Sequence, residues 1–188
     1  DRREDLTGRG SLLYTSQRFS ADMMYSYRFN HSAWGLDKKS WHTVERQMNE
    51  LDLKTDATGY GGQHNLRLGM DYDFGKKNLL NVIYTSQYRY GMDRTKMRGT
   101  AHSDKEDDGN RQLHNVVAHY QSSFGLSAGM DFLFFTSPSQ TALQKSMQEV
   151  SQNLHYDSNQ RINRWLFYAN QLHALKNGTQ INYGVKYT

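Results

Sequence analysis

The sequence predicts an all-β protein, an antiparallel up-and-down meander of about eight strands that forms part of a transmembrane β-barrel. Three observations support this fold class. Apolar and polar residues alternate with the period of two that a β-strand imposes. Short and long connections follow one another in regular succession, and aromatic residues gather toward both ends of the expected strands. Membrane barrels show all three features.

The alternation is clearest over residues 65–74, where a helix would mix the two sets of side chains. One face there is apolar and the other polar or small: Leu66, Leu68, Met70, Tyr72 and Phe74 against Asn65, Arg67, Gly69, Asp71 and Asp73. Four further segments repeat the pattern: 21–30, 80–90, 126–134 and 181–187. Three show it less cleanly: about 10–17, 112–124 and 162–175. On a barrel the polar set faces the interior, where these charged residues could pair: Asp22, Arg28, Arg67, Asp71, Asp73, Arg89 and Asp131.

The connections predict which ends of the strands lie together. Four are short: 17–20, 75–78, the Phe124-Gly125 corner and 176–179, which contains the hairpin dipeptide Asn177-Gly178. Three are long: about 31–62, 91–110 and 137–160. The order short, long, short, long predicts tight periplasmic turns on one side and long extracellular loops on the other.

Aromatic residues predict two belts where the strands would cross the membrane interfaces. One set lies near the short turns: Phe19, Tyr72, Phe74, Phe124 and Tyr183. The other lies toward the opposite strand ends: Tyr25, Tyr27, Phe29, Tyr84 and Tyr88.

Residues 139–154 leave two interpretations open. Leu143, Met147, Val150 and Leu154 recur at helical spacing after Ser137-Pro138, which would suit a short amphipathic helix in an extracellular loop. The other interpretation is that these residues continue the strands above the membrane.

Composition excludes some classes of protein and leaves others open. The mean hydropathy of −0.89 does not separate a soluble protein from a barrel, because only every second barrel residue meets lipid. No stretch approaches the ~18–20 apolar residues of a membrane helix. There is no Cys, so disulfides and thiolate metal sites are excluded. The net charge of +4 is spread along the chain without the basic block of a nucleic-acid-binding protein, and we expect no nucleic-acid partner.

Candidate sites are few. Trp34, Trp41 and Tyr60 lie in the first long connection, where exposed aromatic rings could stack on a ligand or could pack the loop itself. Residues 104–109 partly match a calcium loop, but position 12 is Asn115 where a bidentate Glu is needed, so a hydrated acidic tip is the simpler interpretation. The eight His residues are scattered, and no catalytic spacing occurs. We therefore predict no enzyme activity, no cofactor and no metal site.

Three stretches resemble the barrels of TonB-dependent receptors of Bacteroidota, specifically the outer membrane protein beta-barrel family. They are residues 69–78 with Leu80-Asn81-Val82, residues 161–171, and Asn177-Gly178 followed by residues 181–187. The resemblance covers most of the chain from about residue 10 to 188. Its implied fold is a large barrel closed by an N-terminal plug.

The resemblance also implies a function and a location. Such receptors lie in the bacterial outer membrane and take up siderophores, cobalamin, glycans or peptides, and their partners are the membrane lipid, the plug and the TonB complex. Residues 1–188 contain no plug and form one expected barrel segment, which we interpret as an interior slice of such a receptor. The alternatives are a closed eight-stranded outer-membrane barrel with a structural or adhesive role, and a soluble β-protein that binds its ligand inside.

Overall fold

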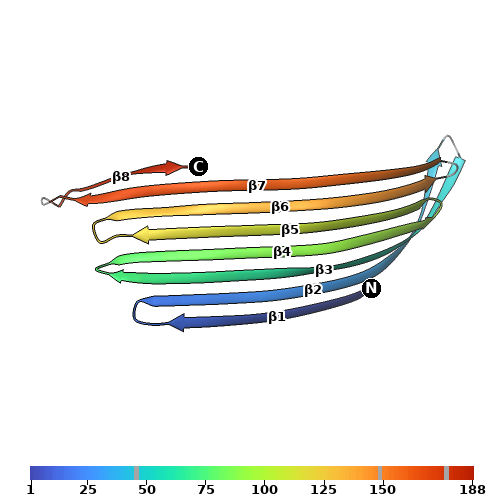
Figure 1. The fold of residues 1–188 in the computed structure, drawn as a ribbon. Coiled ribbons are helices and arrows are strands. Elements are labelled where there is room, and N and C mark those ends of the chain that lie inside the picture. Colours follow the sequence, from blue (N-terminus) through green and yellow to red (C-terminus); the bar gives the residue numbers. More distant parts are fainter. Residues whose placement is uncertain (45–46, 148–149, 176–177) are drawn as a thin grey trace.

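The protein is a single antiparallel sheet in which consecutive strands lie side by side (Figure 1). The computed structural model describes residues 1–188 except 45–46, 148–149 and 176–177. The strands are β1 (Arg2–Thr15), β2 (Phe19–Val44), β3 (Gln47–Gly75), β4 (Asn78–Gly99), β5 (His102–Gln121), β6 (Leu126–Met147), β7 (Val150–Ala174) and β8 (Gln180–Tyr187). The predicted all-β meander of eight strands is confirmed.

The sheet is open, so the alternative of a closed eight-stranded barrel is wrong. Over the described residues β1 pairs only with β2, and β8 pairs only with β7. The two chain ends lie on opposite edges of the sheet (Figure 1). Side chains are exposed along the whole of both edge strands. A barrel built from this sheet therefore needs further strands to satisfy its edges.

The three long connections expected from the sequence are long β-hairpins, and their prediction as loops is wrong. The ladder between β2 and β3 runs without a break to the pair Val44 and Gln47. The ladder between β4 and β5 runs to Met97 and Ser103, and that between β6 and β7 to Met147 and Val150. The alternation of apolar and polar residues fades in these hairpins, while the backbone pairing continues.

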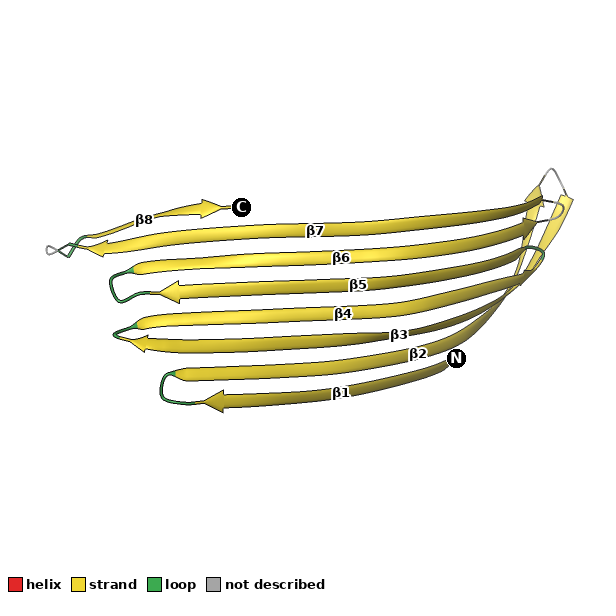
Figure 2. Cartoon of the chain, in the orientation of Figure 1, coloured by secondary structure: helices red, strands yellow, loops and turns green. Residues whose placement is uncertain are grey.

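The segment 139–154 is strand, so the helical interpretation is wrong. It forms the far part of the β6–β7 hairpin, in which Leu143 pairs with Leu154; only residues 148–149 lie outside the described part. Figure 2 shows strands and turns and no helix over the described residues. Those residues accordingly contain no helix that could cross a membrane.

The short turns lie together at the opposite end of the sheet, as predicted (Figure 2). Gly75 pairs with Asn78 across a two-residue turn, Lys76-Lys77. Both lysines have positive φ, 52° and 65°, which is the backbone of a type I′ hairpin turn. The Phe124-Gly125 corner lies between β5 and β6, with Gly125 at φ 91°. Of the predicted turn 176–179, Lys176 and Asn177 lie outside the described residues; Leu175 N–H donates to the Thr179 carbonyl at 2.8 Å across it.

The strand register collects apolar side chains on one face. Residues opposite one another in an antiparallel ladder point to the same side of the sheet. One such row crosses seven strands: Leu12, Met23, Leu68, Tyr84, Val116, Phe132 and Trp165. We call this side the apolar face. A row on the other side, the polar face, begins with Arg9, Ser26, Asn65 and Gln87 and becomes apolar at Leu113 and Phe135.

The sheet has almost no interior of its own. Ala57 is the only hydrophobic residue buried among those described, and large apolar side chains such as Leu12, Phe74 and Val185 are more than half exposed. A single layer with an exposed apolar face cannot be stable in water, because folding would remove too little apolar surface from the solvent. The fold therefore requires an apolar environment on one side.

Candidate functional site: the two faces of the sheet

A row of aromatic rings crosses the apolar face next to the short turns. Neighbouring ring centroids lie 6.1 Å apart for Tyr14 and Phe19, 6.5 Å for Phe19 and Tyr72, 4.7 Å for Tyr72 and Phe74, and 6.4 Å for Phe74 and Tyr120. The sequence predicted Phe19, Tyr72 and Phe74 for this row and missed Tyr14 and Tyr120, whose strands alternate less cleanly. We call it the turn-side belt.

A second cluster of rings lies on the same face farther along the strands, and we call it the tip-side belt. His64 stands at its centre, with ring centroids of Tyr27, Tyr88 and Tyr90 at 4.7, 6.1 and 6.3 Å. The Tyr25 hydroxyl is 2.7 Å from His64 Nδ1. Tyr25, Tyr27 and Tyr88 were predicted. A lone histidine carried no signal in the sequence, and only the register to Tyr27 and Tyr88 could have found it.

The spacing of the two belts suits the thickness of a membrane. Tyr72 and His64 are eight residues apart on β3, about 26 Å along the strand and about 20 Å after the 35–45° tilt of a barrel strand. Between them the face is mainly apolar, with Met23, Leu68 and Val82. This geometry is that of the apolar band and flanking aromatic girdles of a membrane barrel. The prediction of Tyr84 for the tip-side set is wrong, because its register opposite Leu68 places it midway between the belts, where its hydroxyl is 2.8 Å from His114 Nδ1.

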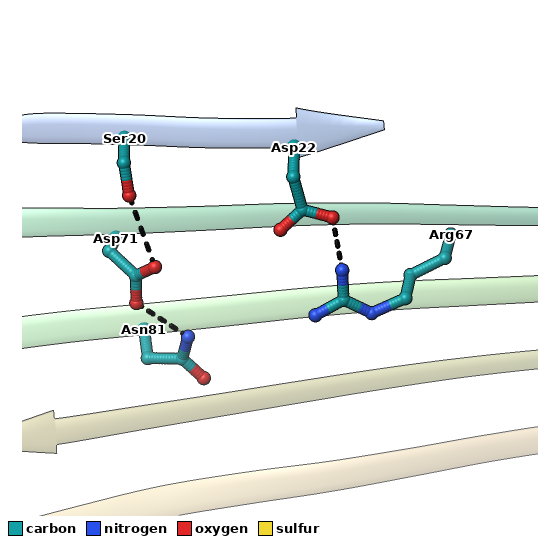
Figure 3. Close-up of polar contacts among 5 residues, drawn as sticks. All are labelled: Ser20, Asp22, Arg67, Asp71 and Asn81. Atoms are coloured by element: carbon teal, nitrogen blue, oxygen red, sulfur yellow. Dashed lines mark hydrogen bonds and ion pairs between the residues drawn. The ribbon is translucent and has the colours of Figure 1, made fainter. Parts of the chain in front are cut away.

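One ion pair forms between the charges predicted for the polar face, and hydrogen bonds lie beside it (Figure 3). Asp22 on β2 pairs with Arg67 on β3. Asp71 accepts hydrogen bonds from the Ser20 hydroxyl at 3.2 Å and from the Asn81 side-chain amide at 2.7 Å. These contacts tie β2, β3 and β4 together on the side where a barrel is polar.

Among the described residues, the other charges predicted for the interior do not pair with one another. Asp131 pairs with Arg164 at 3.1 Å, a partner the sequence did not single out. Arg28 lies 3.9 Å from Asp5. Asp73 accepts the Gly75 N–H at 2.7 Å and so stabilises its own turn.

A hollow of about 710 Å³ lies on the polar face over β1 to β5. A chain of amides forms part of its wall: Gln63 and Gln87 donate to Asn65 Oδ1 at 2.8 and 3.1 Å, and Asn65 donates to the Ser26 hydroxyl at 3.0 Å. Arg9 and Arg67 also line it. Such a surface offers hydrogen bonds to a polar partner on the inner side of a barrel wall.

The structure does not bring the three candidate ligand-binding aromatics together. Trp34, Trp41 and Tyr60 are exposed by 46%, 61% and 47%. Alternation places Trp34 on the polar face and the other two on the side of the apolar face. Trp34 and Trp41 are seven residues apart on β2, or about 23 Å. Tyr60 donates its hydroxyl to Met92 Sδ at 3.6 Å. A ligand-binding role for each stays a prediction.

The acidic segment 104–109 is strand β5 and not a calcium loop. Its side chains point alternately to the two faces, so they cannot converge on one cation. Asp104 is held by Arg94 through two hydrogen bonds of 3.0 and 3.2 Å, and this pairing lowers the pKa of Asp104. Burial works against the ionised form of Asp107, yet hydrogen bonds from Lys105 and Thr141 hold its pKa below the ordinary value. Nowhere in the described part of the chain do three metal-binding side chains gather.

Comparison with solved structures shows what this fold is similar to. No family model matches the sequence, and no curated protein matches it. The ferric yersiniabactin uptake receptor FyuA from Yersinia pestis superposes on 90% of this chain with a TM-score of 0.57 and 11% identity. The ferric-catecholate import receptor Fiu from E. coli K12, in its closed form, covers 97% with a TM-score of 0.44 and 6% identity.

The likeness to FyuA shows the fold. The chain spans 26% of the FyuA chain and 32% of the Fiu chain. The sheet therefore has the fold of a section of a larger β-barrel, which agrees with its open edges and its two unlike faces.

Proposed function

We propose that this chain is a section of the barrel wall of an outer-membrane TonB-dependent receptor that takes up a scarce ligand. The observation that carries the proposal is the register: it gathers the apolar residues of neighbouring strands on one face and sets an aromatic belt on each side of them. Lipid is the environment that would cover such a face. The location in a bacterial outer membrane follows from this.

The open edges support a section of a larger barrel over a complete small one. Unpaired N–H and C=O groups on β1 and β8 are costly within a bilayer, where no water replaces the missing strand. Further strands of the same receptor would pair with both edges. The mixed polar face, with Leu113 and Phe135 half-buried among polar residues, would then be covered from within by a plug domain.

The uptake role rests on the architecture shared with receptors such as FyuA and on the family-like stretches of the sequence. The ligand class, the plug and energy supply from the TonB complex belong to the proposal on the same grounds. Trp34, Trp41 and Tyr60 remain candidate ligand contacts in the extracellular hairpin.

Single-cysteine labelling of the full-length protein in cells tests the topology, and the absence of native Cys in this chain makes it clean. We place a cysteine at Lys38 in the β2–β3 tip, at Lys77 in a short turn and at Leu68 between the belts. A membrane-impermeant maleimide should label Lys38→Cys in intact cells. Lys77→Cys should react only after the outer membrane is permeabilised.

Leu68→Cys completes the test, because it should resist the hydrophilic reagent under both conditions. Ile83→Cys, on the polar face at similar depth, serves as its matched control and should react once the barrel interior is accessible. Labelling of Lys77→Cys in intact cells, or equal labelling of positions 68 and 83, would contradict the proposed membrane topology.

A further inference from the structure

Three glycines leave a bare strip of backbone on the polar face beyond the tip-side belt. Gly61 on β3 pairs with Gly91 on β4, and Gly91 pairs with Gly109 on β5. A side chain at Gly61 would meet the Tyr90 carbonyl oxygen at 2.8 Å, so that position must stay open. The result is a floor without side chains that crosses three strands.

Charged pairs of opposite sign border this floor. On the side toward the belts, Arg89 lies directly opposite Arg111; on the side toward the tips, Asp93 lies opposite Asp107. All four residues and Gly91 line a hollow of about 400 Å³. We call this hollow the glycine trough.

The charges of the trough are not fully neutralised by the described residues. Like charges directly opposite one another on neighbouring strands destabilise a sheet. Asp107 has Lys105 at 2.5 Å and Thr141 at 2.6 Å, and Arg111 lies over the Phe135 ring at 5.9 Å. Arg89 and Asp93 make no ion pair or side-chain hydrogen bond within the described part of the chain, and both are exposed to the trough. An arginine row and a carboxylate row thus face a common open space.

We infer that the glycine trough binds a small extended zwitterion, with its anionic group at Arg89 and Arg111 and its cationic group at Asp93 and Asp107. The inference rests on the proposed function, because only an open barrel interior gives such a ligand access to this face. The two rows are four residues apart on β4, about 13 Å between Cα atoms. A tripeptide with free ends spans about 10 Å, and the side chains of the two rows reach over the remainder.

The probe is trialanine, and isothermal titration calorimetry on the full-length detergent-solubilised receptor measures its binding. Trialanine with free termini should bind about fivefold more tightly than its N-acetylated or C-amidated forms, each of which lacks one charge. Equal binding of the three peptides, or no binding of trialanine, overturns the inference.

Variants assign each end of the probe to one row. Arg89→Gln should weaken the binding of trialanine and abolish the preference for a peptide with a free carboxylate. Asp93→Asn should abolish the preference for a peptide with a free ammonium group. Gly109→Val should prevent binding, because a Cβ there makes only ordinary contacts, with the Ser139 Cβ at 3.6 Å and the Pro138 carbonyl oxygen at 3.8 Å, and the added methyl groups fill the floor.

Matched controls remove the same charges from the other face. Lys96 lies on β4 and Glu106 on β5, both on the side of the apolar face. Lys96→Gln and Glu106→Gln should leave trialanine binding unchanged, and a loss as large as that of Arg89→Gln would overturn the inference. A receptor that passes the cysteine topology test and fails to bind trialanine refutes the trough alone, whereas failure of the topology test refutes the proposed function.

Discussion

An arginine placed at the centre of the apolar band should destabilise the protein strongly. Leu68 is four residues from Tyr72 in one belt and four from His64 in the other, about 13 Å along the strand in each direction. It therefore lies at the middle of the proposed hydrocarbon layer. The cost of an arginine at the midplane of a barrel is about 2–4 kcal/mol, and we expect Leu68→Arg to lower the free energy of unfolding by that amount.

Urea unfolding of the full-length protein in phospholipid vesicles, followed by tryptophan fluorescence, measures this loss. The control is Ile83→Arg on the polar face, whose neighbours in the register are Gly69, opposite Asp22, and Val117, opposite Asp131. The two carboxylates offer the new arginine partners, so this variant should lose less than about 1 kcal/mol. If Ile83→Arg proved the more damaging of the two, the assignment of the faces would be reversed and the membrane argument would fail.

Two further predictions concern the ends of the strands. Replacing Lys76-Lys77 by Asn-Gly should raise the free energy of unfolding by about 1 kcal/mol, since both lysines hold the left-handed φ that Asn and Gly adopt at lower cost; a lower urea midpoint would mean that the lysine side chains themselves stabilise the turn. Asp104 has a lowered pKa beside Arg94, so the pair stabilises the β4–β5 tip at neutral pH and loses this effect as the pH falls through that lowered pKa. Hydrogen exchange of the tip, corrected for intrinsic rates, should then rise on acidification in the natural protein and stay flat in Asp104→Asn.

The part of the fold between the two belts could be predicted from sequence because each strand there has one apolar and one polar face. Between Phe19 and Phe29, or between His64 and Phe74, every second side chain faces the apolar side, and a shift of one residue would turn the whole set over. The alternation therefore determines both the strand and its face. The tight turns were equally clear because they interrupt this pattern for only a few residues.

The tips could not be predicted in the same way. From Trp34 to Trp41 both faces of β2 are open to water, so the sequence is free of alternation although the backbone ladder continues. The helical spacing of Leu143 and Leu154 misled for the same reason: these residues pair with each other across a hairpin and do not share a helix face. When neither face of a strand is buried, the pairing of residues that are distant in sequence produces no pattern in the local sequence.

The candidate sites likewise differ in how far the local sequence could predict them. The belt around His64 and the glycine trough both depend on residues from three strands, and neither His64 nor Gly91 has a neighbour in sequence that marks its role. The polar ion pairs were easier, because opposite charges on the same strand face need only the right register to meet, as Asp22 and Arg67 do.

The near absence of a core shifts the source of stability away from side-chain packing within the chain. Among the described residues the buried hydrophobic contribution reduces to Ala57, so the backbone ladder and the surroundings must supply what a core supplies elsewhere. The backbone ladder alone cannot supply this stability, because its hydrogen bonds replace hydrogen bonds that the unfolded chain makes to water. In a bilayer that competition disappears, and unpaired backbone groups become costly enough to hold neighbouring strands in register. The single-layer sheet is therefore itself an argument for a lipid environment, independent of which residues line its apolar face.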